Sequence, residues 1–330
     1  MDETVPYENK ERGSIRPLFL SGGNMEQSIV SMLPGESFLG LKDRAVRVFD
    51  VIDVRDTTRA DYKNRVGLFI NHIKTKGLNN NSLLEFKRDL ANRIDISTST
   101  KNKYFTTAKV FLKELNRQGV LPVDITQNIK TFTQSKKHKR DGLNLEEISR
   151  LTNKIKGLPV TAHTTRLKAM LSLLIFQGLR QSEIVRLDIK DIDFIGQTAY
   201  VQGKGRDDKE LVNLHPETIK ALREYLDTNK LRDGALFISN SNNSKNNRLS
   251  TRTLRGIIKK TLVELGINKT THGFRHFFTT TLIKTYKGDL LEVAQYTRHR
   301  SLEMLQVYND KVKMDADLPR YYGAFQGVSL

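Results

Sequence analysis

A turn between two predicted helices organises the second half of the chain. Its sequence is Gly178-Leu179-Arg180-Gln181-Ser182-Glu183-Ile184-Val185-Arg186-Leu187. Gly178 ends a strongly apolar helix around residues 167–176, and a new helix starts after it. Arg180 is therefore expected in the turn, with Glu183 one helical turn later to hold it. An arginine in this position can present a rigid planar fork to a phosphate. Because an Arg with a Glu three positions later is more often an ordinary ion pair, this stretch alone assigns no function.

The segments on either side of this turn predict an α-rich domain with a small antiparallel β-sheet. Asn144 and Glu147 have the spacing of a capping box, which opens a helix. Three short β-prone segments follow, at 191–194, 198–202 and 210–214. Further helices are predicted at 216–226, after Ser250, at 272–286, at 290–296 and at 301–308.

The preceding part of the chain predicts a small helical domain. Apolar residues recur at helical spacing from Asp56 to a stop at Gly77, again after Ser82, and again from Ser99 to Gly119. A short fourth helix is predicted around Ile125 and Ile129. Residues 1–52 are expected to be mostly irregular, with one helix near 38–51.

Positive charge is concentrated after residue 50. The net charge is +18, and residues 51–140 carry 19 Lys or Arg against 8 Asp or Glu. Gln134 to Gly142 contains no apolar residue and reads as an exposed basic linker. Basic surfaces of this kind indicate a nucleic acid partner, although a basic surface that only aids solubility is the alternative. Charge alone does not choose between them.

Composition excludes several kinds of chemistry. The 330 residues contain no cysteine, which rules out disulfides, cysteine zinc sites and thiol nucleophiles. No apolar run is long enough to cross a bilayer, and no signal peptide is apparent, so we expect a cytoplasmic protein without a membrane partner, nucleoid-associated when bound to DNA. His272 and His276 have a spacing compatible with zinc, but the metalloprotease glutamate is missing between them. We expect no metal and no ATP.

Two further motifs complete the pattern: His272-Gly273-Phe274-Arg275-His276, and a segment in which His299 stands nine residues before Tyr308. With Arg180 and Glu183 before them, they occur in the order of the tyrosine recombinase family (lambda-type phage integrase, Xer-like), which residues 56–325 resemble. The family also has a lysine in a β-hairpin turn, and Gly203-Lys204-Gly205 matches it. One departure is Thr297-Arg298, where the family usually has Leu-Gly before the histidine.

The resemblance implies a helical core-binding (SAM-like) domain followed by the DNA breaking-rejoining fold. The expected division is 1–52 extension, 53–134 core-binding DNA clamp, 135–142 linker, 143–308 catalytic domain and 309–330 tail, the tail docking on a neighbouring subunit. It also implies double-stranded DNA with paired recombination sites, a homotetramer on DNA, and an accessory DNA-bending or directionality protein. The predicted DNA contacts are Arg59, Lys63, Lys101, Lys103, Lys136, Lys137, Lys139 and Arg140.

The chemistry of phosphodiester cleavage gives each predicted catalytic residue a role. Tyr308 would attack phosphorus, His272 would accept its proton, and Arg180 and Arg275 would clamp the developing negative charge. Lys204 would protonate the leaving 5′ oxygen and His299 would hydrogen-bond the phosphate, while Glu183 and His276 would support them. A 3′-phosphotyrosyl intermediate and a Holliday junction follow from the resemblance.

Several uses of such a site remain open from the sequence. Integration or excision of a mobile element is the first expectation, and Xer-type chromosome or plasmid dimer resolution the second. A type IB topoisomerase-like activity and a non-catalytic DNA-binding protein are further alternatives.

Overall fold

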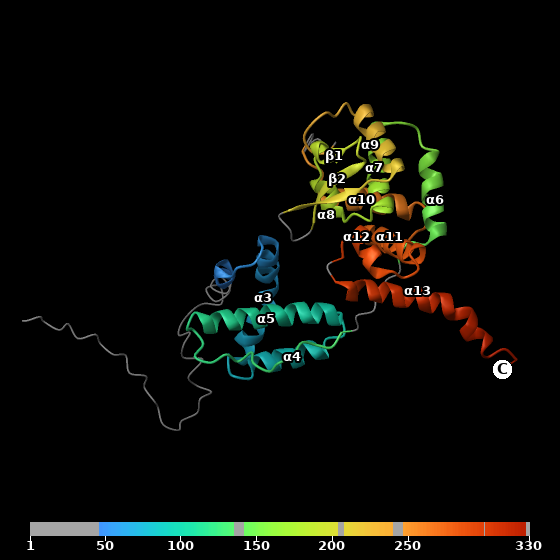
Figure 1. Cartoon of the computed structure of the whole chain (residues 1–330). Coiled ribbons are helices and arrows are strands. Elements are labelled where there is room, and N and C mark those ends of the chain that lie inside the picture. The colour runs from blue at the N-terminus through green and yellow to red at the C-terminus, as the bar shows by residue number, and fades with distance from the viewer. Residues whose placement is uncertain (1–45, 135–141, 204–207, 240–246, 300, 328–330) are drawn as a thin grey trace, which may run out of the picture. The chain divides into compact units, whose positions relative to one another are not determined.

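A computed structural model describes residues 46–134, 142–203, 208–239, 247–299 and 301–327. The chain divides into two compact units, the first ending at Ser135 and the second beginning at Lys136. Both units are mainly helical (Figure 1). The expected linker at 135–142 lies at this division, and all of it except Gly142 lies outside the described residues.

The first unit is built on three amphipathic helices. α3 (Asp56–Lys76), α4 (Ser82–Asn92) and α5 (Thr98–Arg117) pack against one another, as the spacing of apolar residues predicts. Gly77, with φ of 79°, ends α3, and the side chain of Ser97 caps α5. Rings of Phe69, Phe105 and Phe111 form the centre of the core. A short 3-10 helix, η1 (Phe49–Val51), precedes α3, and the rest of the helix expected near 38–51 falls largely outside the described residues.

The predicted fourth helix around Ile125 and Ile129 does not form. Ile125 lies in a turn over residues 125–128 and Ile129 follows it, and both side chains still pack against the core of the first unit. The carboxylate of Asp124 accepts hydrogen bonds from the backbone N–H and the hydroxyl of Thr126, and Asn128 has a φ of 57°. A local side-chain bond therefore competes with the helix for this backbone.

The second unit contains the predicted small sheet and the helices that surround it. β1 (Ile192–Asp193), β2 (Thr198–Gln202) and β3 (Lys209–Asn213) form an antiparallel sheet in that order, with Ala199 paired to Val212. The capping box of Asn144 and Glu147 opens α6 (Leu145–Lys156) as expected. α7 (Ala162–Phe176), α8 (Gln181–Arg186), α9 (Pro216–Thr228) and α10 (Thr251–Val263) complete this part, and β2 packs against α8.

Three C-terminal helices pack together beside this part (Figure 1). They are α11 (Thr271–Thr285), α12 (Leu290–Thr297) and α13 (Leu302–Gly323). The sequence predicted that the last helix ends near Tyr308, but α13 continues for about four further turns. No proline or glycine interrupts the chain between Tyr308 and Leu318, so nothing in the sequence breaks the helix earlier. Tyr308 thus lies within a long helix and not at its end.

In the described part of the chain, no helix is both long and apolar enough to cross a membrane.

Candidate active site

The turn between α7 and α8 is built around Gly178. Its φ is 57°, a left-handed conformation that favours glycine. A Cβ at this position would lie 2.4 Å from a ring carbon of Phe278, so a side chain has no room either. The chain therefore reverses tightly here, which places Arg180 at the start of α8 and turns the Gly178 carbonyl toward Arg275.

Glu183 anchors Arg180. Its side chain is fully buried and accepts hydrogen bonds at 2.8 Å from both the backbone N–H and Nη1 of Arg180. Burial alone would raise the pKa of Glu183, but the positive charge of Arg298, the Arg180 backbone N–H and the Arg180 charge together lower it. Glu183 is therefore ionised. Arg180 itself remains one third exposed, so its guanidinium can reach a ligand.

Arg275 is the second arginine of the site and is almost completely buried on α11. It donates from Nη1 to the Gly178 carbonyl at 2.9 Å and from Nη2 to the Thr297 carbonyl at 2.5 Å. Burial, and then the neighbouring charge of Arg180, lower the pKa of Arg275 to about 10. The side chain therefore still carries its charge at neutral pH. Its two carbonyl contacts tie the turn before α8 to the end of α12.

Tyr308 lies buried on α13 against the histidines of neighbouring segments. The centroid of its ring is 5.0 Å from that of His276 and 6.0 Å from that of His299. Burial raises the pKa of Tyr308, and the charges of Arg275 and Arg180 act in the opposite direction. Tyr308 is therefore a phenol at neutral pH, in the electrostatic field of both arginines. A proton acceptor is needed before it can attack phosphorus.

His276 lies closer to Tyr308 than the sequence indicated. The prediction gave the role of proton acceptor to the exposed His272 and placed His276 in a supporting position. In the structure the His276 ring lies 4.8 Å from His272 and 5.0 Å from Tyr308. Since residues four apart share one face of a helix, the two histidines are neighbours on α11 and their rings meet edge to face, with His276 next to the tyrosine.

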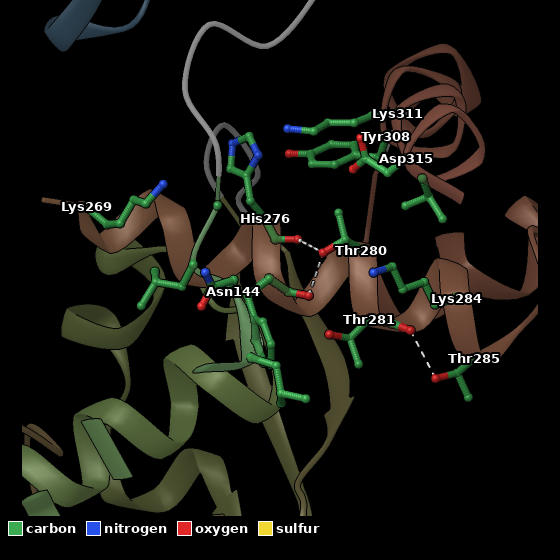
Figure 2. A pocket seen from close by; sticks show the side chains of 15 residues that line it. Asn144, Lys269, His276, Thr280, Thr281, Lys284, Thr285, Tyr308, Lys311 and Asp315 are labelled. Atoms are coloured by element: carbon green, nitrogen blue, oxygen red, sulfur yellow. Dashed lines mark hydrogen bonds between the residues drawn. The ribbon is translucent and has the colours of Figure 1, made fainter. Parts of the chain in front are cut away.

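A pocket of about 540 Å³ opens beside Tyr308. Figure 2 shows Tyr308, Lys311 and Asp315 of α13 on one side and His276, Thr280 and Lys284 of α11 on another. Within the described ranges, no group of three or more His, Asp or Glu side chains is arranged to hold a metal ion.

The structure thus brings together five of the six predicted catalytic residues, namely Arg180, His272, Arg275, His299 and Tyr308. Lys204 lies outside the described residues, between β2 and β3 as the hairpin prediction requires. The sequence did not anticipate one further member, Arg298, which donates from Nη2 to Glu183 at 2.8 Å. Its only signal was the departure from the expected Leu-Gly before His299.

The predicted DNA contacts of the first unit have other partners. Arg59 donates to the carbonyls of Phe49, Ile52 and Val54, Lys63 pairs with Asp50, and Lys101 donates to the Ala91 carbonyl. Lys103 is exposed on α5. Arg59 and Lys63 therefore hold the segment before α3 in place, and all four residues remain predictions as DNA contacts. Lys136, Lys137, Lys139 and Arg140 lie outside the described residues.

A buried tyrosine among two arginines and three imidazoles, on this mainly helical fold, defines a class: enzymes that break DNA strands with a tyrosine. Residues 142–314 match the Phage integrase family. The chain therefore belongs to this family of tyrosine recombinases, which break and rejoin DNA.

Curated relatives carry Xer names. The chain is 29% identical over 208 residues to tyrosine recombinase XerC of Serratia marcescens, covering 62% of this chain and 65% of that protein, just under two thirds of its length. It is 29% identical over 278 residues to tyrosine recombinase XerD of Oceanobacillus iheyensis, covering 72% of this chain and 90% of that protein.

Solved structures confirm the fold. The XerH site-specific recombinase, in a post-cleavage complex with palindromic difH substrate, aligns with a TM-score of 0.69 at 20% identity over 86% of this chain and 84% of that chain. The Tn1549 transposon integrase in complex with transposon right end DNA aligns with a TM-score of 0.64 at 14% identity, over 85% of this chain and 99% of that chain.

Proposed function

We propose that this protein performs site-specific recombination by cleaving duplex DNA with Tyr308. The observation that carries the proposal is the position of Tyr308, buried on α13 within the field of Arg180 and Arg275 and in ring contact with His276 and His299. These are the groups that an attack on a phosphodiester requires: a nucleophile, positive charge for the phosphate and a proton acceptor.

In the proposed reaction, the Tyr308 oxygen attacks phosphorus and the bond from phosphorus to the 5′ oxygen breaks. The phenolic proton passes to an imidazole, His272 or the adjacent His276, and Lys204 gives a proton to the leaving 5′ oxygen. Arg180 and Arg275 hold the non-bridging oxygens, and His299 donates a hydrogen bond to the phosphate. The 3′-phosphotyrosyl bond keeps the energy of the broken bond, so the reverse reaction with a second 5′ hydroxyl rejoins DNA without ATP or a metal.

We further propose strand exchange of the Xer type at paired sites, through a Holliday junction and a tetramer. The sequence favoured integration or excision of a mobile element. The Xer names of the curated relatives instead favour dimer resolution, while the transposon integrase supports only the shared fold at 14% identity. Dimer resolution and integration can be separated in cells that express the protein and carry a plasmid with two directly repeated copies of a candidate chromosomal site. Resolution between two copies of one chromosomal site supports the Xer type, and recombination only with a second, unlike site supports a mobile element.

The end of α13 is the proposed contact with a neighbouring subunit. Tyr321, Tyr322 and Phe325 are all exposed, and the ring of Tyr321 contacts the rings of the other two. Exposed aromatic clusters are typical of protein interfaces. Serine at all three positions should prevent assembly on DNA while leaving the monomer folded. Unchanged tetramers on DNA, measured by light scattering, would contradict this contact.

An accessory DNA-bending protein stays a prediction.

The central test uses a nicked DNA duplex as the substrate. After the attack, a short fragment with the 5′ hydroxyl is released, so the reaction cannot reverse and the covalent complex accumulates. Wild-type protein should form a complex that survives SDS and is sensitive to protease, and Tyr308→Phe should form none. The matched control is Tyr296→Phe, because Tyr296 is partly exposed on α12 and makes its ring contact with Tyr286.

The same assay separates the alternatives. Relaxation of supercoiled plasmid without recombinant products would favour a topoisomerase-like activity. If neither wild type nor Tyr308→Phe forms a covalent complex or changes the DNA, the non-catalytic DNA-binding alternative is favoured.

A further inference from the structure

Arg298 has a backbone conformation that is unusual for an arginine. It ends α12 with φ of 55° and ψ of 39°, the left-handed region in which glycine is favoured and an L side chain is strained. Its N–H donates to the Ala294 carbonyl, which closes the helix and requires no side chain. Glycine would therefore close α12 better than arginine does, so the side chain must contribute something else.

The other described residues with positive φ, apart from glycines, show the contrast. They are Asn128, Gln197, Lys230 and Lys287, and all four are exposed. Arg298 alone among these five directs its side chain inward, where only 7% of it is accessible. The strained conformation therefore coincides with a buried guanidinium.

Among the described residues, the buried guanidinium pairs with Glu183. Nη2 of Arg298 donates to Oε2 of Glu183 at 2.8 Å, while Nε and Nη1 are buried without a hydrogen-bond partner among the described residues. A buried carboxylate is costly unless its charge is balanced, and Arg180 alone would have to balance it while remaining available to a phosphate. Arg298 supplies the second positive charge.

We propose that Arg298 is a positioning residue, which keeps Glu183 ionised so that Glu183 can hold Arg180 in the orientation that binds the DNA phosphate. This inference rests on the proposed function and extends it to a residue outside the six catalytic positions. Arg298 acts through Glu183 and Arg180, and no contact with DNA is required of it.

The proposal makes a pH-dependent prediction. The charges that face Glu183 are Arg180 and Arg298, with Arg275 close by. In Arg298→Gly, the pKa of Glu183 rises because its largest opposing charge is lost. As pH falls through that raised pKa, Glu183 becomes protonated and Arg180 loses its anchor. The rate of covalent complex formation by the variant should therefore drop about tenfold for each pH unit below the raised pKa.

The experiment measures covalent complex formation on the nicked duplex between pH 5.5 and 8.5 for wild type, Arg298→Gly and Arg298→Lys. We expect a large loss at low pH in Arg298→Gly, a smaller loss at high pH, and recovery in Arg298→Lys, which keeps the charge. The matched control is Lys287→Gly, which removes an equally strained residue from the exposed end of α11. It should follow the wild-type profile. A wild-type profile in Arg298→Gly, or a loss that is equal at every pH, would overturn the proposal.

A second measurement does not depend on cleavage. The unfolding equilibrium in urea is compared for wild type, Arg298→Gly, Glu183→Gln and the double variant. If Arg298 balances the Glu183 charge, Arg298→Gly should lower the folding equilibrium constant much less in the Glu183→Gln background than in wild type. The expected difference between the two backgrounds is at least about tenfold. Additive effects would overturn the proposal. If wild type forms no covalent complex, the proposed function fails, and this cycle still decides whether Arg298 supports the Glu183 carboxylate.

Discussion

The ring of His276 lies 5.0 Å from the ring of Tyr308, at an angle of 59°, and bridges the helices α11 and α13. The ring of the more exposed His272 lies 4.8 Å from the ring of His276. The second histidine of the motif, one helical turn beyond the one expected from the sequence, is therefore in ring contact with the nucleophile, as His299 is from another segment.

Replacing His276 with Gln should lower the rate of covalent complex formation by about 10²-fold or more, because a positioned proton acceptor contributes about that much. The rate is measured in single turnover on the nicked duplex. If His276 only fills space, His276→Phe should retain the wild-type rate, and that result would return the role of proton acceptor to His272.

Gly142→Ala tests the same contact without removing the imidazole. A Cβ at Gly142 would lie 2.6 Å from the Cβ of His276, so either His276 or the Gly142 backbone must shift. The expected result is a slower reaction with unchanged DNA affinity. Gly157→Ala is the control, since its Cβ would meet only the Lys154 and Asn153 carbonyl oxygens, at ordinary contact distances.

Gly178→Ala should destabilise the second unit by about 2 to 4 kcal/mol, combining the left-handed strain with the contact against Phe278. It should also move the carbonyl that accepts from Arg275 and so reduce cleavage. Gly266→Ala isolates the strain, because φ is 68° there and nothing lies within 4 Å of the added Cβ. If urea denaturation gives equal losses of unfolding free energy for Gly178→Ala and Gly266→Ala, the contact with Phe278 does not contribute to the destabilisation.

The buried phenol of Tyr308 should make stability depend on pH above 10. Burial raises the pKa of Tyr308 in the folded protein, whereas an unfolded tyrosine titrates near about 10. This contribution is therefore complete below pH about 10 and is lost as pH rises through the folded pKa. Urea denaturation at pH 9 to 11 should show wild type losing more stability than Tyr308→Phe. Parallel curves would mean that Tyr308 is not buried.

DNA affinity should depend strongly on salt, because a protein of net charge +18 releases counterions when it neutralises phosphates. Lys103→Ala should reduce the slope of log affinity against log salt by about 1 if this exposed lysine of α5 contacts a phosphate. Lys230→Ala, an exposed lysine of the second unit, is the comparison. An unchanged slope for Lys103→Ala would remove it from the proposed interface.

Sequence reasoning succeeded where local signals were strong. The capping box at Asn144, the stop at Gly77 and the strands β2 and β3 each depend on a few adjacent residues, and the described elements agree with these predictions. The helix predicted around Ile125 and Ile129 was wrong because apolar spacing cannot reveal that the Asp124 carboxylate accepts a hydrogen bond from the Thr126 backbone N–H.

Long-range contacts were the part that sequence could not supply. The spacing of His272 and His276 places them on one helical face, but which of them meets Tyr308 depends on how α13 packs on α11. The pairing of Arg298 with Glu183 joins residues 115 positions apart. Only the departure at Thr297-Arg298 hinted at it.

The length of α13 has a mechanical consequence. Tyr308 and Tyr321 are 13 residues apart on this helix, or about 20 Å at the usual rise. From Tyr308 to Leu318 the helix is an unbroken rod of about 15 Å, and Pro319 then removes one backbone donor near the aromatic end. A push or twist applied to the rod would be carried directly to the nucleophile, whereas the missing donor at Pro319 weakens the helix between the rod and the aromatic end. Lengthening the lever by one helical turn would thus preserve its direction, and a two-residue insertion would rotate the aromatic end by more than half a turn relative to the nucleophile.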